Sequence, residues 1–109
     1  MTRPDAVTPE LRDEVFALDG QRCVARRIEP GVSICRNRWG APIISTGKQP
    51  KTALTVDHVK DQPMMGKRAP SDERHLVTLC WEHHVNTGWA TGHRPELRIY
   101  LANRHGAAL

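Results

Sequence analysis

Residues 75–84 read HLVTLCWEHH, and this stretch decides the fold more than any other part of the chain. The first half, from His75 to Cys80, has the apolar and β-branched residues of a short strand. The second half, from Trp81 to about residue 87, is predicted to be helical and to end at Gly88. Cys80 and His83 stand at this strand-to-helix junction with the spacing by which two nearby side chains hold one tetrahedral zinc ion.

The other ligands of such an ion must come from further away. The chain has 3 cysteines, which fit a disulfide framework poorly. Cys23, Cys35, Cys80 and His83 make a complete Cys3His set, so we predict one structural Zn2+ that ties the first loop to the junction. The alternative is that the cysteines are small buried hydrophobes, since the gap between Cys23 and Cys35 is wider than in a usual zinc knuckle.

A partner strand is predicted over residues 52–59, which read TALTVDHV. Leu54, Val56 and His58 fall on one face of this strand, whereas Asp57 lies on the other. The two strands would form a hairpin packed on a helix. Such a unit is too small to be stable alone in water, which again favours a structural metal.

Two further helices are predicted to flank this unit in one α+β domain. The first runs to Gly20 and begins where Thr8 can cap it and Pro9 suits its first turn. The second spans about 95–103. Apolar residues recur at helical spacing in both: Leu11, Val15 and Leu18 in the first, and Leu97, Tyr100 and Leu101 in the second. We expect a single domain over residues 1–109, with a flexible N-terminus (1–8), a core of about 10–90, and long loops over 23–51 and 60–74.

Composition points to a polyanionic partner. The chain has 109 residues, a formal net charge of +4 and a sequence pI of about 9.3. A small basic domain of this kind favours nucleic acid as the ligand. The chain shows neither a signal peptide nor a stretch long enough to span a membrane, so we expect a cytoplasmic protein without a membrane partner.

His84 directly follows His83 and is expected to face a different site, because neighbouring residues on a helix point about 100° apart. Asp57 and His58, at the end of the first strand, are the natural residues to share that site. A carboxylate and imidazoles suit a divalent ion, and a neutral histidine can take a proton from water. The trio therefore supplies a base and a metal site for phosphodiester hydrolysis.

The segments LTVDHV (54–59) and HLVTLCWEHH (75–84) closely resemble the ββα-metal motif of HNH endonucleases. The usual pattern is a strand ending in D-H, followed by N-L-x-x-L-C-x-x-C-H. The resemblance covers about residues 10–90, and with GKRAP (66–70) and GWAT (88–91) the chain is similar to small HNH proteins of actinobacterial phages. It implies a zinc-stapled ββα-metal (His-Me finger) fold and a DNA endonuclease.

By this resemblance His58 would be the general base, while Asp57 and His84 would hold one catalytic divalent ion (Mg2+, Mn2+, Ni2+ or Zn2+). Cys80 and His83 would be the second zinc pair, with His83 where the family more often has cysteine. His75 stands where the family has asparagine. This histidine is expected to take over a catalytic role by orienting the base or shaping the loop, or to ligate the metal.

Contacts with DNA are predicted at basic residues near the proposed site: Lys60, Lys67, Arg68 and Arg94. No helix looks like a base-reading element, so binding should be salt-sensitive and weakly sequence-specific. The resemblance to phage proteins implies work beside the packaging terminase in the host cytoplasm. Two alternatives stay open: a non-catalytic zinc module that binds nucleic acid or a protein, and a scaffold whose metal is only structural. The sequence leaves the oligomeric state undetermined.

Overall fold

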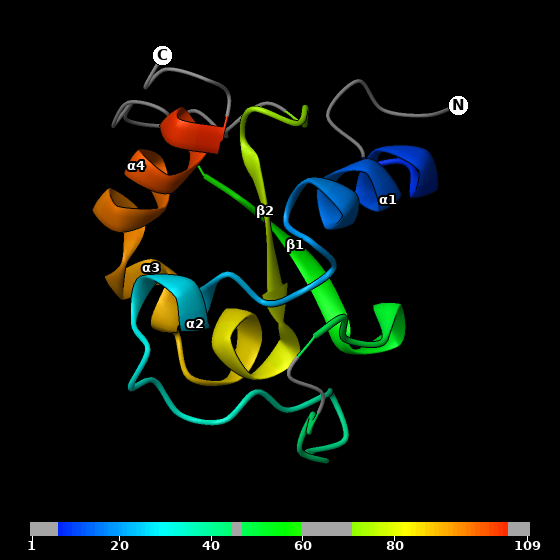
Figure 1. Ribbon diagram of the computed structural model, residues 1–109, viewed down its shortest axis with the longest axis vertical. Helices are drawn as coiled ribbons and strands as arrows, with labels where there is room; N and C mark the ends of the chain where they lie inside the picture. Colours follow the sequence, from blue (N-terminus) through cyan, green and yellow to red (C-terminus); the bar gives the residue numbers. More distant parts are fainter. Residues whose placement is uncertain (1–6, 45–46, 60–70, 105–109) are drawn as a thin grey trace.

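The computed structural model describes residues 7–44, 47–59 and 71–104, and its centre is a two-stranded antiparallel sheet with helices on both sides (Figure 1). In chain order the helical and extended elements are α1 (Pro9–Leu18), α2 (Ala25–Ile28), the 3-10 turn η1 (Lys51–Ala53), β1 (Leu54–His58), β2 (Leu76–Cys80), the π-helical turn η2 (Glu82–Asn86), α3 (Trp89–Gly92) and α4 (Arg94–Arg104). In this described part, no helix is long and apolar enough to cross a membrane.

Helix α1 begins as its sequence predicts. The backbone N–H of Leu11 donates to the Thr8 hydroxyl at 3.1 Å, Pro9 occupies the first turn, and Gly20 follows the helix at φ +70°. The predicted apolar face is wrong at its end, since Leu18 is 43% exposed. The next residue, Asp19, caps the helix and is buried instead, with its carboxylate bonded to β2.

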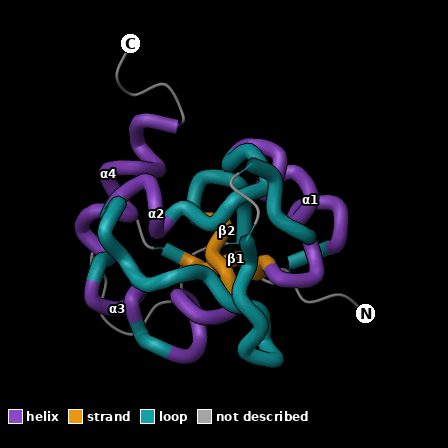
Figure 2. The backbone as a smooth tube through the Cα atoms, turned by 60° about the horizontal axis from the view of Figure 1, so that its bottom comes forward, coloured by secondary structure: helices purple, strands orange, loops and turns teal. Residues whose placement is uncertain are grey.

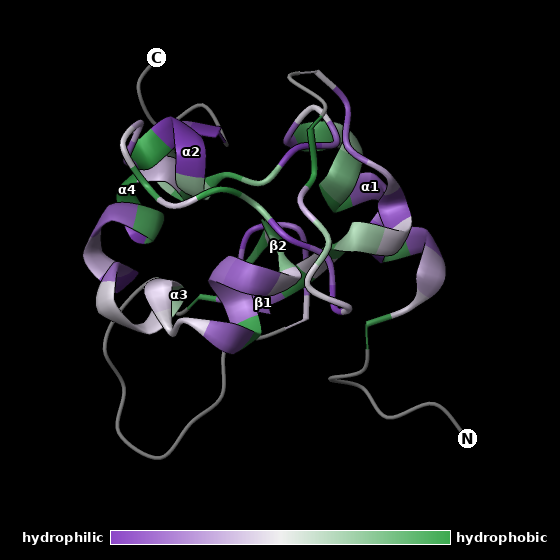
Figure 3. Cartoon of the chain, turned by 90° about the horizontal axis from the view of Figure 1, so that it is seen from below, coloured by the Kyte–Doolittle hydropathy of each residue, from purple (hydrophilic) through white to green (hydrophobic). Residues whose placement is uncertain are grey.

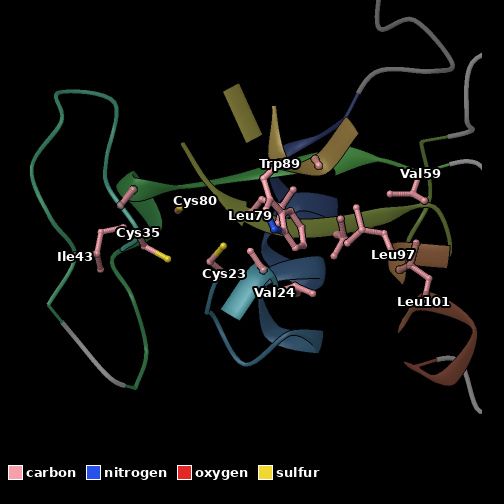
Figure 4. Packing of buried hydrophobic residues seen from close by; sticks show 14 residues of the cluster. Cys23, Val24, Cys35, Ile43, Val59, Leu79, Cys80, Trp89, Leu97 and Leu101 are labelled. Atoms are coloured by element: carbon pink, nitrogen blue, oxygen red, sulfur yellow. The ribbon is translucent and has the colours of Figure 1, made fainter. Parts of the chain in front are cut away.

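The sheet separates two layers of packing. Thr78 lies on the face toward α1, because its hydroxyl donates to the Val15 carbonyl at 3.4 Å. Val77 and Leu79 point to the other face, where they join the main core with α3 and α4 (Figure 4). The outer helices α1 and α4 carry both polar and hydrophobic residues, as helices that cover a sheet do (Figure 3).

The strands and the last helix lie close to their predicted positions, but their ends differ. The strand predicted over 52–59 begins as the turn η1 and is extended only from Leu54 to His58, while the second strand starts at Leu76 rather than His75. Helices α2 and α3 interrupt stretches without a predicted element. Four residues are too few for helical periodicity to show, and tertiary contacts hold these turns instead. Most of the chain between α2 and β1 is loop (Figure 2).

A buried carboxylate joins three of these elements. Asp19 is fully buried, and its Oδ1 accepts from the Tyr100 hydroxyl at 2.5 Å and from Arg104 Nη1 at 2.8 Å. Its Oδ2 accepts from the backbone N–H of Thr78 at 2.9 Å. Because every donor here is directed at one charged group, the end of α1, strand β2 and helix α4 are held in one arrangement.

Titration of Tyr100 should report this network directly, because it is the only tyrosine. Burial and the hydrogen bond to Asp19 raise the pKa of Tyr100 from its ordinary value of 10.0 to about 12. Between these values the folded state keeps a proton that the unfolded state releases, so the free energy of unfolding should fall as pH rises from about 10 to about 12. Ultraviolet absorbance and urea unfolding measure the two effects.

The matched variant is Tyr100→Phe, which keeps the ring and removes the titrating hydroxyl. The variant should lose part of the pH dependence above about pH 10 that the wild type shows. A wild-type tyrosine that ionises at its ordinary pKa would contradict the network.

Candidate metal centres

The four predicted zinc ligands lie together. The ligand atoms of Cys23, Cys35, Cys80 and His83 are all within 4.8 Å of one another, and all four residues are buried. Cys23 follows α1, Cys35 comes from the loop after α2, Cys80 ends β2, and His83 stands in η2. Figure 4 shows the three cysteines approaching from these separate segments. The wide gap between Cys23 and Cys35 is closed by the fold.

The spacing of these atoms matches a tetrahedral zinc site. His83 Nδ1 lies 3.1 Å from Cys80 Sγ, 3.6 Å from Cys23 Sγ and 3.7 Å from Cys35 Sγ. Zinc bonds of about 2.3 Å to sulfur and about 2.1 Å to nitrogen place such ligand atoms about 3.6 Å apart at tetrahedral angles. The donor set and its geometry therefore fit a structural metal such as zinc.

The thiols are unequal in acidity because they are crowded together. Hydrogen bonds from Cys23 and Cys80 lower the pKa of Cys35 to about 3, whereas the bond to Cys35 is the largest cause that raises the pKa of Cys23. Burial lowers the pKa of His83, but the hydrogen bond and charge of Cys80 outweigh it, so the pKa is raised. A divalent cation would stabilise all three cysteines as thiolates at once.

Backbone hydrogen bonds hold Cys23 and Cys35, the two cysteines far from the junction in sequence, in place. The backbone N–H of Cys23 donates to the side-chain oxygen of buried Gln49 at 2.8 Å, and the next residue, Val24, donates to the Thr78 carbonyl at 2.9 Å. The carbonyl of Cys35 accepts from Ile43 at 2.9 Å. These bonds join the loop and the turn after α1 to β2, which explains how the ligands reach one another.

Ser33 orients the imidazole of His83. Its hydroxyl lies 3.2 Å from His83 Nε2, on the ring side opposite the thiols. A proton on Nε2 that is donated to Ser33 leaves the Nδ1 lone pair directed at the cysteines, as metal ligation requires. Trp89 packs edge-on against the same ring at 6.2 Å.

Ser33→Ala should weaken zinc binding by about 10- to 100-fold, because the ring loses the partner that selects its tautomer. Competition with a chromophoric chelator measures this affinity. Ile34→Ala changes the exposed neighbour of Ser33 and serves as the control. Equal zinc affinity in the Ser33 variant and the wild type would remove Ser33 from the site.

A contact between a carboxylate and an imidazole lies further along β1. His84 Nε2 is 3.2 Å from Asp57 Oδ1, and His84 Nδ1 is 2.7 Å from the Thr55 hydroxyl. Thr55 donates its single hydroxyl proton to the Leu79 carbonyl at 2.8 Å. It must therefore accept from His84, so the proton sits on Nδ1 and the lone pair of a neutral His84 faces Asp57.

Two lone pairs directed at each other need a cation or a proton between them. Bonds of about 2.1 Å from a divalent ion to nitrogen and oxygen place two ligand atoms about 3.0 to 3.4 Å apart, from octahedral to tetrahedral angles. The distance between Asp57 and His84 falls in this range. The alternative is a protonated His84, which makes the same contact an ion pair.

Arg94 holds the second oxygen of Asp57. Its Nη1 donates to Asp57 Oδ2 at 2.6 Å and to the His58 carbonyl at 2.8 Å. Burial raises the pKa of Asp57, but the contact with His84 and the charge of Arg94 together outweigh burial, so the net shift is downward. Asp57 is thus kept ionised, with Oδ1 directed at His84.

The remaining predicted site residues lie neither in the zinc set nor in the contact between Asp57 and His84. His58 leaves β1 on the face opposite Asp57, is exposed, and has Nε2 at 2.9 Å from the Ser71 hydroxyl. His75 faces Asp72 at 2.7 Å, while its carbonyl accepts from Val59 at 2.7 Å. The structure thus gives His75 a place in the turn before β2. Lys60, Lys67 and Arg68 lie outside the described residues.

Sequence reasoning missed the residues that orient the ligands. Ser33, Gln49 and Thr55 are common polar residues, and only their contacts distinguish them. Of these three, Thr55 is the one that the sequence could have indicated, because it precedes Asp57 by two positions and so shares its strand face. Comparison of the chain with protein-family models, with curated proteins and with solved structures found no match.

Proposed function

We propose that this protein is a metal-dependent endonuclease that hydrolyses DNA phosphodiester bonds, as the resemblance to HNH endonucleases implies. Asp57 and His84 would hold one divalent ion, and His58 would act as the general base. The observation that carries the proposal is the 3.2 Å contact between Asp57 Oδ1 and His84 Nε2, which a divalent ion could bridge. His58 follows Asp57 on β1, with its exposed side chain on the other face of the strand.

The surrounding residues would prepare both groups for this reaction. Thr55 keeps the proton of His84 on Nδ1, and Arg94 holds Asp57 by the oxygen that is turned away from His84. Ser71 would orient His58 by accepting a hydrogen bond from Nε2–H, so that Nδ1 can take a proton from water. Ser71 would then do for the base what the family's asparagine does.

A bound divalent ion supplies positive charge for the transition state and the leaving 3′ oxygen. The zinc set has a separate duty. Cys80 and His83 hold the junction between β2 and η2, and His84 is the next residue along that turn. The formal net charge of +4 favours contact with the DNA backbone. A partner protein, such as the phage terminase that the resemblance implies, would then select the target.

The test is cleavage of supercoiled plasmid with Mg2+, Mn2+, Ni2+ or Zn2+, with the wild type beside His58→Ala. Loss of the general base should slow cleavage by about 10²- to 10⁴-fold without loss of fold or of structural zinc. The control is His93→Ala, which removes a histidine bonded to Glu29 instead. Undiminished cleavage by the His58 variant, with contaminating nuclease excluded, would refute the assignment.

A second candidate is a non-catalytic zinc module that binds nucleic acid. The ion pair between Arg94 and Asp57 favours it, because a 2.6 Å contact already balances the buried carboxylate without a metal. This candidate predicts DNA binding with no cleavage under any of the four ions. Nicking that depends on His58 excludes it.

A further inference from the structure

A cavity of about 650 Å³ lies along β1, at the strand end opposite His58. Residues 51–56 form one wall, helix α1 contributes Arg12 and Phe16, and Trp39 and Trp81 also line the cavity, which is open to solvent. In the described part of the chain β1 has only β2 as a neighbour, so the cavity runs beside the open edge of the sheet. Its volume is in the range of small-ligand pockets.

Trp39 lies in a turn that is held by hydrogen bonds to the side chain of Asn37. Its side chain is 70% exposed, although the turn that carries it is well bonded. The Asn37 side-chain oxygen accepts from the backbone N–H groups of Trp39 at 2.9 Å and Ala41 at 3.0 Å, and Gly40 takes the positive φ of +83° that the turn needs. Arg38 lies 4.5 Å from the centre of the indole ring. The turn therefore presents a pre-organised aromatic face.

The charge of the cavity wall is positive. Arg12, Arg38 and Lys51 line it together with a single acid, Asp13, which pairs with Lys51 at 3.4 Å. With Lys51 and Asp13 balancing each other, the positive charge of the wall comes from the two arginines, which lie beside two tryptophans. Cations that contact phosphate, next to an aromatic face that stacks on a base, are the combination by which proteins bind single-stranded nucleic acid.

The cavity is linked to the Asp57–His84 pair through β1. Thr55 lines the cavity, and the hydroxyl of the same residue holds His84. Trp81 lines it as well and stands two residues before His83. The loop that carries Trp39 is also tied to the zinc ligands, since the Arg36 carbonyl accepts from Glu82 at 3.2 Å.

We propose that this cavity binds an unpaired nucleotide of single-stranded DNA, with its base stacked on Trp39 and its phosphates near Arg12 and Arg38. The claim that this nucleotide lies beside the bond to be cut rests on the function proposed above. The claim that the cavity binds nucleic acid does not. The preferred substrate is therefore DNA with a frayed or single-stranded segment, since bases inside a duplex are already stacked on each other.

The test is fluorescence anisotropy with a labelled thymidine oligonucleotide and zinc-loaded protein, without added divalent ion so that no cleavage occurs. Trp39→Ala should weaken binding about tenfold, and Arg12→Ala should reduce the slope of log Kd against log salt by about 0.7. The controls are Ile99→Ala and Arg98→Ala on α4, which do not line the cavity. Exposure of Trp39 means that its variant should fold.

Plasmid cleavage by the same wild-type protein and its Trp39→Ala and Arg12→Ala variants, measured beside oligonucleotide binding, separates the two proposals. Binding that depends on Trp39 in a protein that never cuts DNA supports the cavity and refutes the nuclease. Oligonucleotide affinity that is unchanged in both Trp39→Ala and Arg12→Ala overturns the cavity proposal, whether or not the protein cuts. That result would point instead to a peptide strand paired along the open edge of β1.

Discussion

Replacing His83 with alanine is expected to release the structural zinc and to unfold much of the protein. Zinc binding contributes about 10–16 kcal/mol in small zinc domains, which is as large as the whole stability of a typical domain. His83 is fully buried and its Nδ1 contacts all three cysteines, so its loss leaves three buried thiolates without their fourth ligand. Elemental analysis and thermal unfolding measure the loss.

The expected stoichiometry is one zinc per wild-type chain and none in the variant, with loss of the cooperative melting transition. Addition of a strong chelator to the wild type should reproduce both effects. One zinc per chain and an unchanged Tm in His83→Ala would mean that His83 is not a ligand of the structural zinc.

Replacing His84, the next residue, should have the opposite pattern. His84→Ala should keep one zinc and a normal Tm, because its imidazole faces Asp57 and Thr55 rather than the cysteines. The function proposed here requires it to lose at least about 10³-fold in divalent-dependent plasmid cleavage, since stabilisation by a metal ion amounts to several kcal/mol. Plasmid nicking under the ion that best supports the wild type is the measurement.

The two adjacent histidines are controls for each other. Both substitutions remove an imidazole from η2, so a general effect of shortening the side chain would appear in both. Loss of zinc in His84→Ala, or full cleavage by it, would contradict the division of the two residues between two sites.

This division could be predicted from local geometry alone. Adjacent residues on any helical turn point in different directions, so His83 and His84 could not both serve one ion. The structure has a π-helical turn in place of the expected α-helix, with Thr87 bonded to the Glu82 carbonyl at 3.0 Å. The assignment of His83 and His84 to two sites is unaffected, because in either kind of helix the side chains of successive residues point in different directions.

Cys35 shows where local geometry is insufficient. A count of thiols identifies it as the remaining ligand, but no spacing rule predicts that its loop returns to Cys80. That return depends on contacts between distant segments, such as the bond from Glu82 to the Arg36 carbonyl beside Cys35 and the bond from Cys23 to the buried side chain of Gln49. Such contacts span 26 residues in the case of Gln49 and Cys23, well beyond the reach of a local pattern.

His75 is the residue for which the resemblance was least informative. Its place in the motif predicts a role at the base, yet its imidazole bonds Asp72 and the described structure puts Ser71 at His58. The catalytic role of His75 stays a prediction. Asp72 and Ser71 precede the motif by a few residues, in a turn whose course the sequence leaves open.

The sequence by itself determined the types of ligand, the hairpin and the strand-to-helix junction, because each follows from the spacing of neighbouring residues. Only the tertiary structure decided which atoms meet. Thr55 sets the tautomer of His84, Arg94 reaches Asp57 from 37 positions away, and Trp39 stands over a cavity beside β1. These contacts arise when helices and loops pack on the two faces of one small sheet, and packing joins residues that local periodicity treats as unrelated.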